Sequence, residues 1–362
     1  MKDTIKQEHK FPYKWTLKDA VFTKDKGKVF SCFACGGGST MGYKLAGFDV
    51  LGCNEIDPKM MEAYTTNHSP KYSFLEGIQT FKLREDLPAE LYELDILDGS
   101  PPCSSFSMAG NREADWGKEK KFREGQADQV LDTLFFDFID LAKKLQPKVV
   151  VAENVKGLLL GDAINYVKRI YKEFNDAGYY CKHWLLDASK MGVPQKRERV
   201  FFICLRKDLA KPFLEQIDLF YKLPKLNLDF NESEILWNEI IDEEDNFETL
   251  GKLDGELWEK RKFGDVDLSD ISIRERNILS RFNAKFLYKH KTANTITAGE
   301  QCVLFDKKRN RNKTELLKCG TYPIDYNFNI LKPEYLVGMS VPPVMTAQIA
   351  TEIYSQWLSK IN

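Results

Sequence analysis

The sequence lacks the features that mark membrane, disulfide-rich and metal-binding proteins. No apolar run approaches the roughly 20 residues needed to cross a bilayer, and the opening stretch MKDTIKQEHK has no apolar core of the signal-peptide type. There are only four histidines, and the single C-x-x-C (Cys32 and Cys35) has no second pair at zinc-ribbon spacing. The eight cysteines are too sparse for a disulfide scaffold. We therefore expect a cytoplasmic protein with free thiols and no structural metal.

A strong net charge is also missing. The formal net charge of −1 neither requires nor excludes a polyanionic partner, because a local patch can bind phosphate on a neutral molecule. The charges are unevenly distributed: residues 231–250 carry eight acids and no lysine or arginine, whereas residues 307–313, KKRNRNK, are basic. Taken alone, each segment is more readily interpreted as a solvated surface.

Apolar runs alternate with segments of helical periodicity over the first half of the chain. The strand-like runs lie at 29–33, 49–57, 95–100, 148–155 and 199–205, and the expected helices at 58–66, 129–145 and 162–177. This alternation predicts an α/β protein with a doubly wound, mostly parallel sheet. Polar motifs follow the ends of these runs, where open α/β sheets bind ligands.

The alternation stops near residue 206, and this sets the expected domains. At 362 residues the chain exceeds the roughly 250 to 300 at which one core stops growing. We expect a main catalytic and cofactor-binding domain from 29–205 plus 325–362, and a smaller irregular domain from 206–324. Residues 1–28 form an N-terminal extension to which the sequence assigns no role.

A glycine-rich stretch follows the first strand-like run. Residues 35–42, CGGGSTMG, are predicted to form a loop that opens a helix. In such a loop, missing side chains let a ligand approach backbone N–H groups. The stretch does not match the dinucleotide fingerprint G-x-G-x-x-G, because Met41 stands where the last glycine belongs. Glu55, at the end of the next run, is placed to accept hydrogen bonds from a ribose. A site for an adenosine-containing cofactor and a tight βα turn are equally compatible with this loop.

Cys103 lies in DGSPPCSSFS, behind two prolines that each fix φ near about −65°. A free cysteine is most often a buried apolar residue, and a nucleophilic one needs positive neighbours that favour the thiolate. QKRER, at 195–199, supplies Arg197 and Arg199. Glu153 follows KVVVA, where a carboxylate is costly unless it is paired or caps a helix. Together these residues would bring a nucleophile, an acid and two cations to adjacent strand ends.

In this order and spacing, the motifs resemble those of the S-adenosylmethionine-dependent DNA (cytosine-5)-methyltransferases. The resemblance runs from about residue 29 to 205 and resumes from about 290 to 357. Its motifs are FACGGGSTMGYKLAGF, NEID, DGSPPCSSFS, VAENV, QKRERVFFI, TANTITAG and VGMSVPPVMTAQIA. It implies a Rossmann-like class I methyltransferase fold, in which the irregular segment 206–324 is the target-recognition domain.

The resemblance also implies a chemistry. Cys103 would add to carbon 6 of a cytosine flipped out of duplex DNA, and carbon 5 would then accept the methyl group of S-adenosylmethionine. Glu153 would protonate the ring-nitrogen edge, Arg199 would bind the carbonyl oxygen, and Arg197 would position the site. The carbonyl of Pro101 would face the amino group of the base. S-adenosylhomocysteine would be the second product.

Binding residues follow from the same motifs. The implied cofactor-binding residues are Phe33, Ala34, Cys35, Gly36, Gly38, Glu55, Ile56, Ile78, Ser100, Pro102, Ser340 and Val341. The implied DNA-binding residues are Ser107, Lys120, Lys121, Arg123, Lys308 and Arg309. Three departures bear on cofactor affinity: Cys35 replaces the usual first glycine, Gly77 replaces an acid, and Met339 replaces an asparagine.

We expect a monomeric, sequence-specific enzyme of the restriction-modification or phage type, associated with a bacterial nucleoid. Its partners would be double-stranded DNA and a companion restriction endonuclease, with no membrane. One alternative is a tRNA cytosine-5 methyltransferase, which typically has threonine in the place of Ser107. Others are a non-catalytic DNA-binding protein of the same fold and a thiol oxidoreductase built on Cys32 and Cys35. The residues do not reveal the target sequence.

Overall fold

The computed structural model describes residues 9–102, 133–217, 222–242, 248–278, 284–299 and 301–361. Its centre is a seven-stranded sheet of order β3-β2-β1-β4-β5-β7-β6. The strands are β1 (Lys28–Cys32), β2 (Asp49–Glu55), β3 (Tyr72–Leu75), β4 (Ile96–Gly99), β5 (Val149–Val155), β6 (Tyr179–Asp187) and β7 (Glu198–Arg206). Neighbours from β3 to β5 are parallel, and β7 runs antiparallel to both β5 and β6. The predicted α/β fold with a mostly parallel sheet is confirmed.

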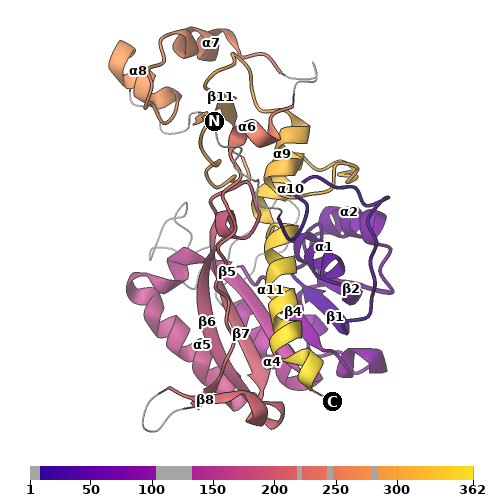
Figure 1. The fold of residues 1–362 in the computed structure, drawn as a ribbon. Coiled ribbons are helices and arrows are strands. Elements are labelled where there is room, and N and C mark those ends of the chain that lie inside the picture. Colours follow the sequence, from indigo (N-terminus) through magenta and orange to yellow (C-terminus); the bar gives the residue numbers. More distant parts are fainter. Residues whose placement is uncertain are drawn as a thin grey trace.

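Helices cover both faces of this sheet (Figure 1). They are α1 (Gly38–Leu45), α2 (Pro58–His68), α3 (Ile78–Phe81), α4 (Leu134–Leu145), α5 (Ile164–Asp176) and α11 (Pro343–Gln356). Successive strand residues point to opposite faces, so Phe30 packs with α4 and α5 while Val29 packs with α1 and α11. Burial on both faces explains why these strands read as continuous apolar runs in the sequence.

The second lobe, residues 231–319, lies beyond one end of the sheet and carries α7 and α8 at its far tip (Figure 1). Its elements are α6 (Trp237–Ile240), α7 (Lys252–Glu259), α8 (Leu268–Arg276), β10 (Lys285–Leu287), β11 (Cys302–Leu304) and α9 (Lys313–Cys319). Trp258, Phe286 and Val303 belong to its own small core. The hairpin β8 (Leu214–Gln216) and β9 (Lys222–Pro224) comes before this lobe, and α10 (Pro333–Met339) follows it.

A shared apolar cluster joins the two lobes. Met41 and Met60 from the sheet side pack with Trp237 and Tyr326, and Trp15 of the N-terminal segment belongs to the same cluster. The Trp15 indole N–H donates to the carbonyl of Thr321 at 2.9 Å. The N-terminal segment is therefore packed against the chain where it leaves the second lobe.

The domain division drawn from the sequence stays a prediction. Leu226 and Leu228 pack in the same core as α11, so the chain remains with the sheet beyond the expected boundary at 206. Across the described ranges, no helix is both long and apolar enough to span a membrane. In the same ranges, no group of three or more His, Cys, Asp or Glu side chains could hold a metal ion.

Candidate active site

Glu153 and Arg199 meet at the carboxyl end of β5, which we call the active edge of the sheet. Glu153 lies near the end of β5 and Arg199 at the start of β7, directly opposite Val155 in the register. Arg199 Nε is 3.1 Å from Glu153 Oε1, and the two side chains are 16% and 12% exposed, respectively. Because β7 is antiparallel to β5, its first residues lie beside the carboxyl end of β5. The structure thus brings together two of the predicted catalytic residues.

The proline turn is attached to the same edge. Asn154 Nδ2 donates to the carbonyl of Pro101 at 3.1 Å, which places the turn beside the residue that follows Glu153. This carbonyl was expected to face a base, and in the structure one of its two acceptor sites is already taken by Asn154.

Several predicted residues cannot be placed. Those outside the described residues are Cys103, Ser107, Lys120, Lys121 and Arg123.

Arg197 is buried between three segments and is only 2% exposed. Its guanidinium donates to the carbonyl of Ile296 at 3.0 Å and to that of Gly338 at 2.9 Å. Burial and the nearby Arg199 lower the pKa of Arg197 to about 9, so it remains protonated at neutral pH. Arg197 therefore joins the approach to β7 to the loop before residue 299 and to α10, which suits a positioning role.

Glu55 ends β2 and holds the backbone around the glycine loop, which we define as residues 33–38. Its Oε2 accepts the N–H of Cys35 at 2.8 Å, and its Oε1 accepts those of Ile56 at 2.8 Å and Asp57 at 2.9 Å. A carboxylate has about four acceptor sites, so roughly one remains on Oε2. Burial raises the pKa of Glu55, while the three N–H bonds oppose that shift.

The glycine loop has an unusual backbone. Phe33 and Cys35 have φ of 52° and 46°, a left-handed conformation that costs a residue with a side chain about 1–2 kcal/mol. Gly37 precedes α1 and has no side chain to cap the first N–H groups of the helix, which have no intrahelical partner. A Cβ on Gly38 would lie 2.5 Å from the carbonyl oxygen of Val341. The structure therefore brings Ser340 and Val341 against the loop, as the motif order implied.

The other predicted cofactor residues are distributed around the carboxyl ends of β1, β2 and β4. The half-buried ones are Phe33, Ala34, Ile56, Ser100 and Pro102. Ile78 differs, because its side chain is buried in the main core beneath the sheet. Ser340 is buried as well, and its hydroxyl accepts a hydrogen bond from Tyr322 at 2.6 Å.

Asp98 is a functional candidate to which the sequence argument assigned no role. Its carboxyl lies buried on β4 and accepts hydrogen bonds from the Ser31 hydroxyl at 2.6 Å and the Tyr43 hydroxyl at 3.1 Å. Burial raises the pKa of Asp98 to about 7, and the charge of Glu153 adds to that shift. The sequence feature that could have identified Asp98 is an acidic residue inside the apolar run ILDG.

Lys308 and Arg309, the two predicted DNA contacts in the second lobe, differ in exposure. Lys308 is on the surface, and its ammonium pairs with Glu259 at 2.7 Å. Arg309 has a side chain only 4% exposed, and its guanidinium binds Glu315 at 2.6 Å and the carbonyl of Asp242 at 3.1 Å. The guanidinium of Arg309 therefore makes contacts inside the lobe, and its predicted contact with DNA stays a prediction.

A basic aromatic face, defined as residues 260–263 and 289–291, was not anticipated. Phe263 is 76% exposed, and its ring stacks on His290 with centroids 5.6 Å apart and planes 20° apart. The sequence around these rings, KRKF and KHK, supplies five cationic side chains. Lys262 and Lys289 are both exposed. The interleaving of basic and aromatic residues was the signal that could have identified this face.

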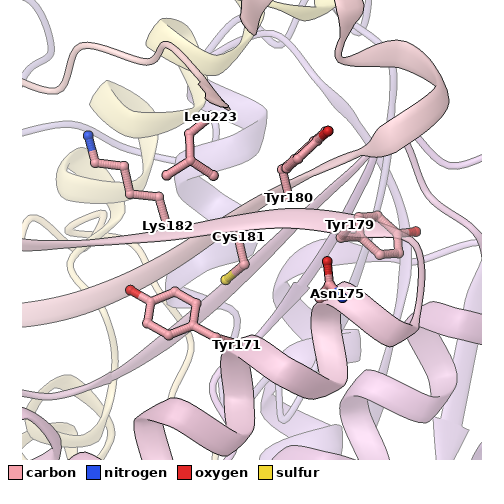
Figure 2. Close-up of a pocket in the computed structure, with 7 residues that line it drawn as sticks. All are labelled: Tyr171, Asn175, Tyr179, Tyr180, Cys181, Lys182 and Leu223. Atoms are coloured by element: carbon pink, nitrogen blue, oxygen red, sulfur yellow. The ribbon is translucent and has the colours of Figure 1, made fainter. Parts of the chain in front are cut away.

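A pocket of about 320 Å³ lies elsewhere, at the outer edge of the sheet. Figure 2 shows Tyr171 and Asn175 of α5 and Tyr180 and Cys181 of β6 around it. None of the predicted site residues lines this pocket. We therefore place the candidate site at the Glu153–Arg199 edge.

Comparisons with known proteins relate the chain to DNA methyltransferases. The chain is 38% identical over 182 residues to the type II methyltransferase M.FnuDI of Fusobacterium nucleatum, covering 50% of this chain and 48% of that protein. It thus spans about half the length of that relative. Against the type II methyltransferase M.Bsp6I of a Bacillus species it is 29% identical, over 91% of this chain and 99% of the relative.

The fold has a counterpart among solved structures. A DNA modification methyltransferase encoded within a prophage of E. coli superposes with a TM-score of 0.64 at 19% identity, covering 91% of this chain and 99% of that one. The match to the C-5 cytosine-specific DNA methylases extends over residues 27–355, which include both lobes and every motif named above. The chain belongs to the C-5 cytosine-specific DNA methylase family.

Proposed function

We propose that this protein is a sequence-specific DNA cytosine-5 methyltransferase of the type II or phage kind. The observation that carries the proposal is the Glu153–Arg199 pair, 3.1 Å apart, beside the Pro101–Pro102 turn that leads directly into Cys103. A carboxyl and a guanidinium held together at a partly closed edge suit the polar rim of a pyrimidine. The family to which the chain belongs is dependent on S-adenosylmethionine.

Each residue has a distinct task in this proposal. The Cys103 thiolate adds to carbon 6 of the flipped cytosine, which makes carbon 5 nucleophilic. Glu153 gives a proton to the ring-nitrogen edge, and Arg199 donates to the ring carbonyl oxygen as negative charge develops. Carbon 5 then takes up the methyl group, a base removes the proton from carbon 5, and Cys103 leaves as thiolate while the ring-nitrogen proton returns to Glu153. Arg197 keeps the surrounding backbone in place.

The residues around the glycine loop fit S-adenosylmethionine, which supplies the methyl group. Glu55 keeps about one acceptor site on Oε2, which suits a ribose hydroxyl. The uncapped N-terminus of α1 offers N–H groups and a partial positive charge to a carboxylate. Ser340 and Val341 close the loop from the other side. We assign the cofactor-binding role to these residues and to the half-buried strand-end residues named above.

Duplex DNA is the proposed partner of the basic aromatic face. Lys260, Lys262, Lys289 and Lys291 are exposed cations that can neutralise phosphates, and Phe263 offers an exposed ring between them. The chain runs only five residues from His290 to Thr295, whose hydroxyl donates to the carbonyl of Lys196 next to Arg197. Five extended residues span at most about 18 Å. The face therefore lies within reach of a duplex engaged at the active edge.

Methyl transfer from labelled cofactor tests the proposal directly. The protein is incubated with methyl-labelled S-adenosylmethionine and mixed-sequence duplex DNA. We expect label in DNA cytosine, and we expect labelling to stop once every copy of the recognised sequence is methylated. Cys103→Ser should abolish labelling, because a hydroxyl of much higher pKa forms almost no anion at neutral pH. Cys181→Ser is the matched control, since this thiol lies at the outer pocket, and it should retain activity.

Two outcomes would overturn the proposal. One is the absence of label in DNA under conditions that saturate the cofactor, and the other is undiminished labelling by Cys103→Ser. A parallel incubation with tRNA separates the RNA-directed alternative, because that enzyme would label tRNA in preference to duplex DNA. DNA binding without any transfer would favour the non-catalytic alternative.

A further inference from the structure

The carbonyl of Gly36, in the middle of the glycine loop, is held by two ring donors from outside the loop. The Tyr326 hydroxyl donates to it at 2.6 Å, and His68 Nε2 lies 3.2 Å from it. His68 is the last residue of α2. Tyr326 belongs to the return segment, residues 320–331, which leads from the second lobe back to α10. Two distant parts of the chain thus converge on one peptide group.

The glycines make this approach possible. A Cβ on Gly36 would lie 2.7 Å from the Tyr326 hydroxyl oxygen, and a Cβ on Gly37 would lie 2.3 Å from His68 Nε2. These separations are too short for real atoms, so side chains at either position would push the rings away. The rings of Tyr326 and His68 therefore occupy the space that side chains at these two glycines would fill.

His68 makes this contact at a cost to stability. A carbonyl only accepts hydrogen bonds, so the His68 proton must be on Nε2, which leaves Nδ1 as a bare acceptor. Nδ1 is buried and, within the described residues, has no hydrogen-bond partner. An unsatisfied buried group of this kind costs about 1–3 kcal/mol. Burial also lowers the pKa of His68 to about 3, so the ring is neutral under ordinary conditions.

The loop needs such support because of Cys35. This residue adopts a φ of 46°, where glycine is favoured, so its Cβ opposes the conformation that the turn requires. The N–H of Cys35 is held by Glu55 on one side of the residue, and on the other side the carbonyl of the following residue, Gly36, is held by Tyr326 and His68. Fixing both flanking groups restrains the strained residue between them.

We propose that Tyr326 and His68 are positioning residues that hold the Gly36 carbonyl and so keep the glycine loop ready to bind S-adenosylmethionine. This rests on the proposed function. Neither residue touches the reacting atoms. Tyr326 also makes cofactor affinity depend on the return segment, because its hydroxyl links that segment to the loop.

Tyr326→Phe removes only the hydroxyl and tests the proposal. Titration of the DNA-free protein with S-adenosylhomocysteine should give a Kd roughly three- to tenfold higher than for the unchanged protein, which is the loss of one hydrogen bond. In methyl transfer, the KM for S-adenosylmethionine should rise by a similar factor while kcat stays within about twofold. Such a split is the signature of lost loop positioning.

Tyr179→Phe is the matched control. Tyr179 is also buried, and its hydroxyl donates to the carbonyl of Pro147 at 2.9 Å, away from the glycine loop. It should lower stability to a similar extent and leave the Kd unchanged. Equal Kd values for Tyr326→Phe and the unchanged protein, or an equal weakening by both variants, would overturn the proposal. If the unchanged protein does not bind S-adenosylhomocysteine, the proposed function fails first and takes this inference with it.

Discussion

Glu153 keeps its place in the sheet edge because Arg199 faces it across β5 and β7. A partly buried carboxylate is costly when it is alone, and removing one partner leaves an uncompensated charge. The pair is open enough to admit a substrate, since both side chains retain some exposure. In the proposed chemistry only the carboxyl can pass a proton to the base, because an arginine keeps its own.

Glu153→Gln tests that dependence. Glutamine keeps the shape and can still accept a hydrogen bond from Arg199, but it cannot give up a proton to the base. We expect kcat to fall by about 10²- to 10⁴-fold. The unfolding midpoint should also fall, because the partly buried Arg199 loses its counter-charge. Glu198→Gln is the control, because this exposed carboxylate at the same edge pairs with Lys156 and not with Arg199. A Glu153→Gln enzyme with unchanged kcat would contradict the assigned role.

Asp98 predicts a specific pH dependence of stability. Its pKa is raised by burial to about 7, above the value near 4 in the unfolded chain, so the folded state binds the extra proton between these limits. Its contribution to stability is therefore fully present below about pH 4 and is lost as the pH rises through about 7.

Asp98→Asn should remove this dependence, because asparagine does not titrate. We expect the unfolding free energy of the unchanged protein to fall, relative to that of the variant, by roughly 1.4 kcal/mol per pH unit between pH 5 and 7. Urea unfolding of both proteins at several pH values measures this difference. Parallel curves for the two proteins would show that Asp98 is not the group responsible.

At the scale of elements, the direction of β7 explains how the site forms. QKRER leads into the start of β7, while Glu153 is close to the end of β5, and only an antiparallel pair brings both to one edge. The apolar run RVFFICL predicted a strand but carried no information on direction. The sequence therefore predicted the residues of the site better than their arrangement.

The parts that the sequence missed share a physical reason. Strand β6 contains Lys182 and His183 and has one hydrogen-bonding edge without a neighbour in the seven-stranded sheet, so its apolar pattern is weak. Arg309 was read as a surface cation because its partner is set by folding, since Glu315 is held in a capping box at the start of α9. The runs buried on both faces, such as that of β5, were predicted because burial demands continuous apolar residues.

The basic aromatic face gives a prediction that separates its two components. Lys262→Ala should weaken duplex binding and reduce the slope of log K against log salt by about 0.9, because one phosphate contact is lost. Phe263→Ala should weaken binding by an amount that does not change with salt, because the ring carries no charge. Fluorescence anisotropy over a salt series measures both effects.

Leu83→Ala is the control for this face, since Leu83 is an exposed apolar residue of the sheet lobe, and it should bind like the unchanged protein. Equal salt slopes for Lys262→Ala and the unchanged protein would show that Lys262 does not contact a phosphate.

At the scale of the whole molecule, the N-terminal segment holds the return segment in place. Trp15 donates to Thr321 and accepts from Ile324, both at 2.9 Å, and the N–H of Leu17 donates to the carboxylate of Asp325 at 2.7 Å. The N-terminal segment therefore fixes the chain that carries Tyr326.

Trp15→Ala should lower the unfolding free energy by about 3–5 kcal/mol, because a large buried ring and its hydrogen bonds are lost. Urea unfolding gives the value. Val21→Ala is the control, since Val21 is 84% exposed. This substitution should change the unfolding free energy by less than about 0.5 kcal/mol. A negligible effect of Trp15→Ala would mean that the segment only rests on the surface.

The chain enters and leaves the second lobe through one apolar core. Ile235, where the chain enters the lobe, and Leu317 and Tyr322, where it leaves, pack in the same cluster. The lobe is therefore an insertion whose ends are anchored near each other, and each doubling of such a loop adds only about 0.6 kcal/mol of closure entropy. Evolution can accordingly lengthen, shorten or exchange this insertion while the sheet and its active edge are retained.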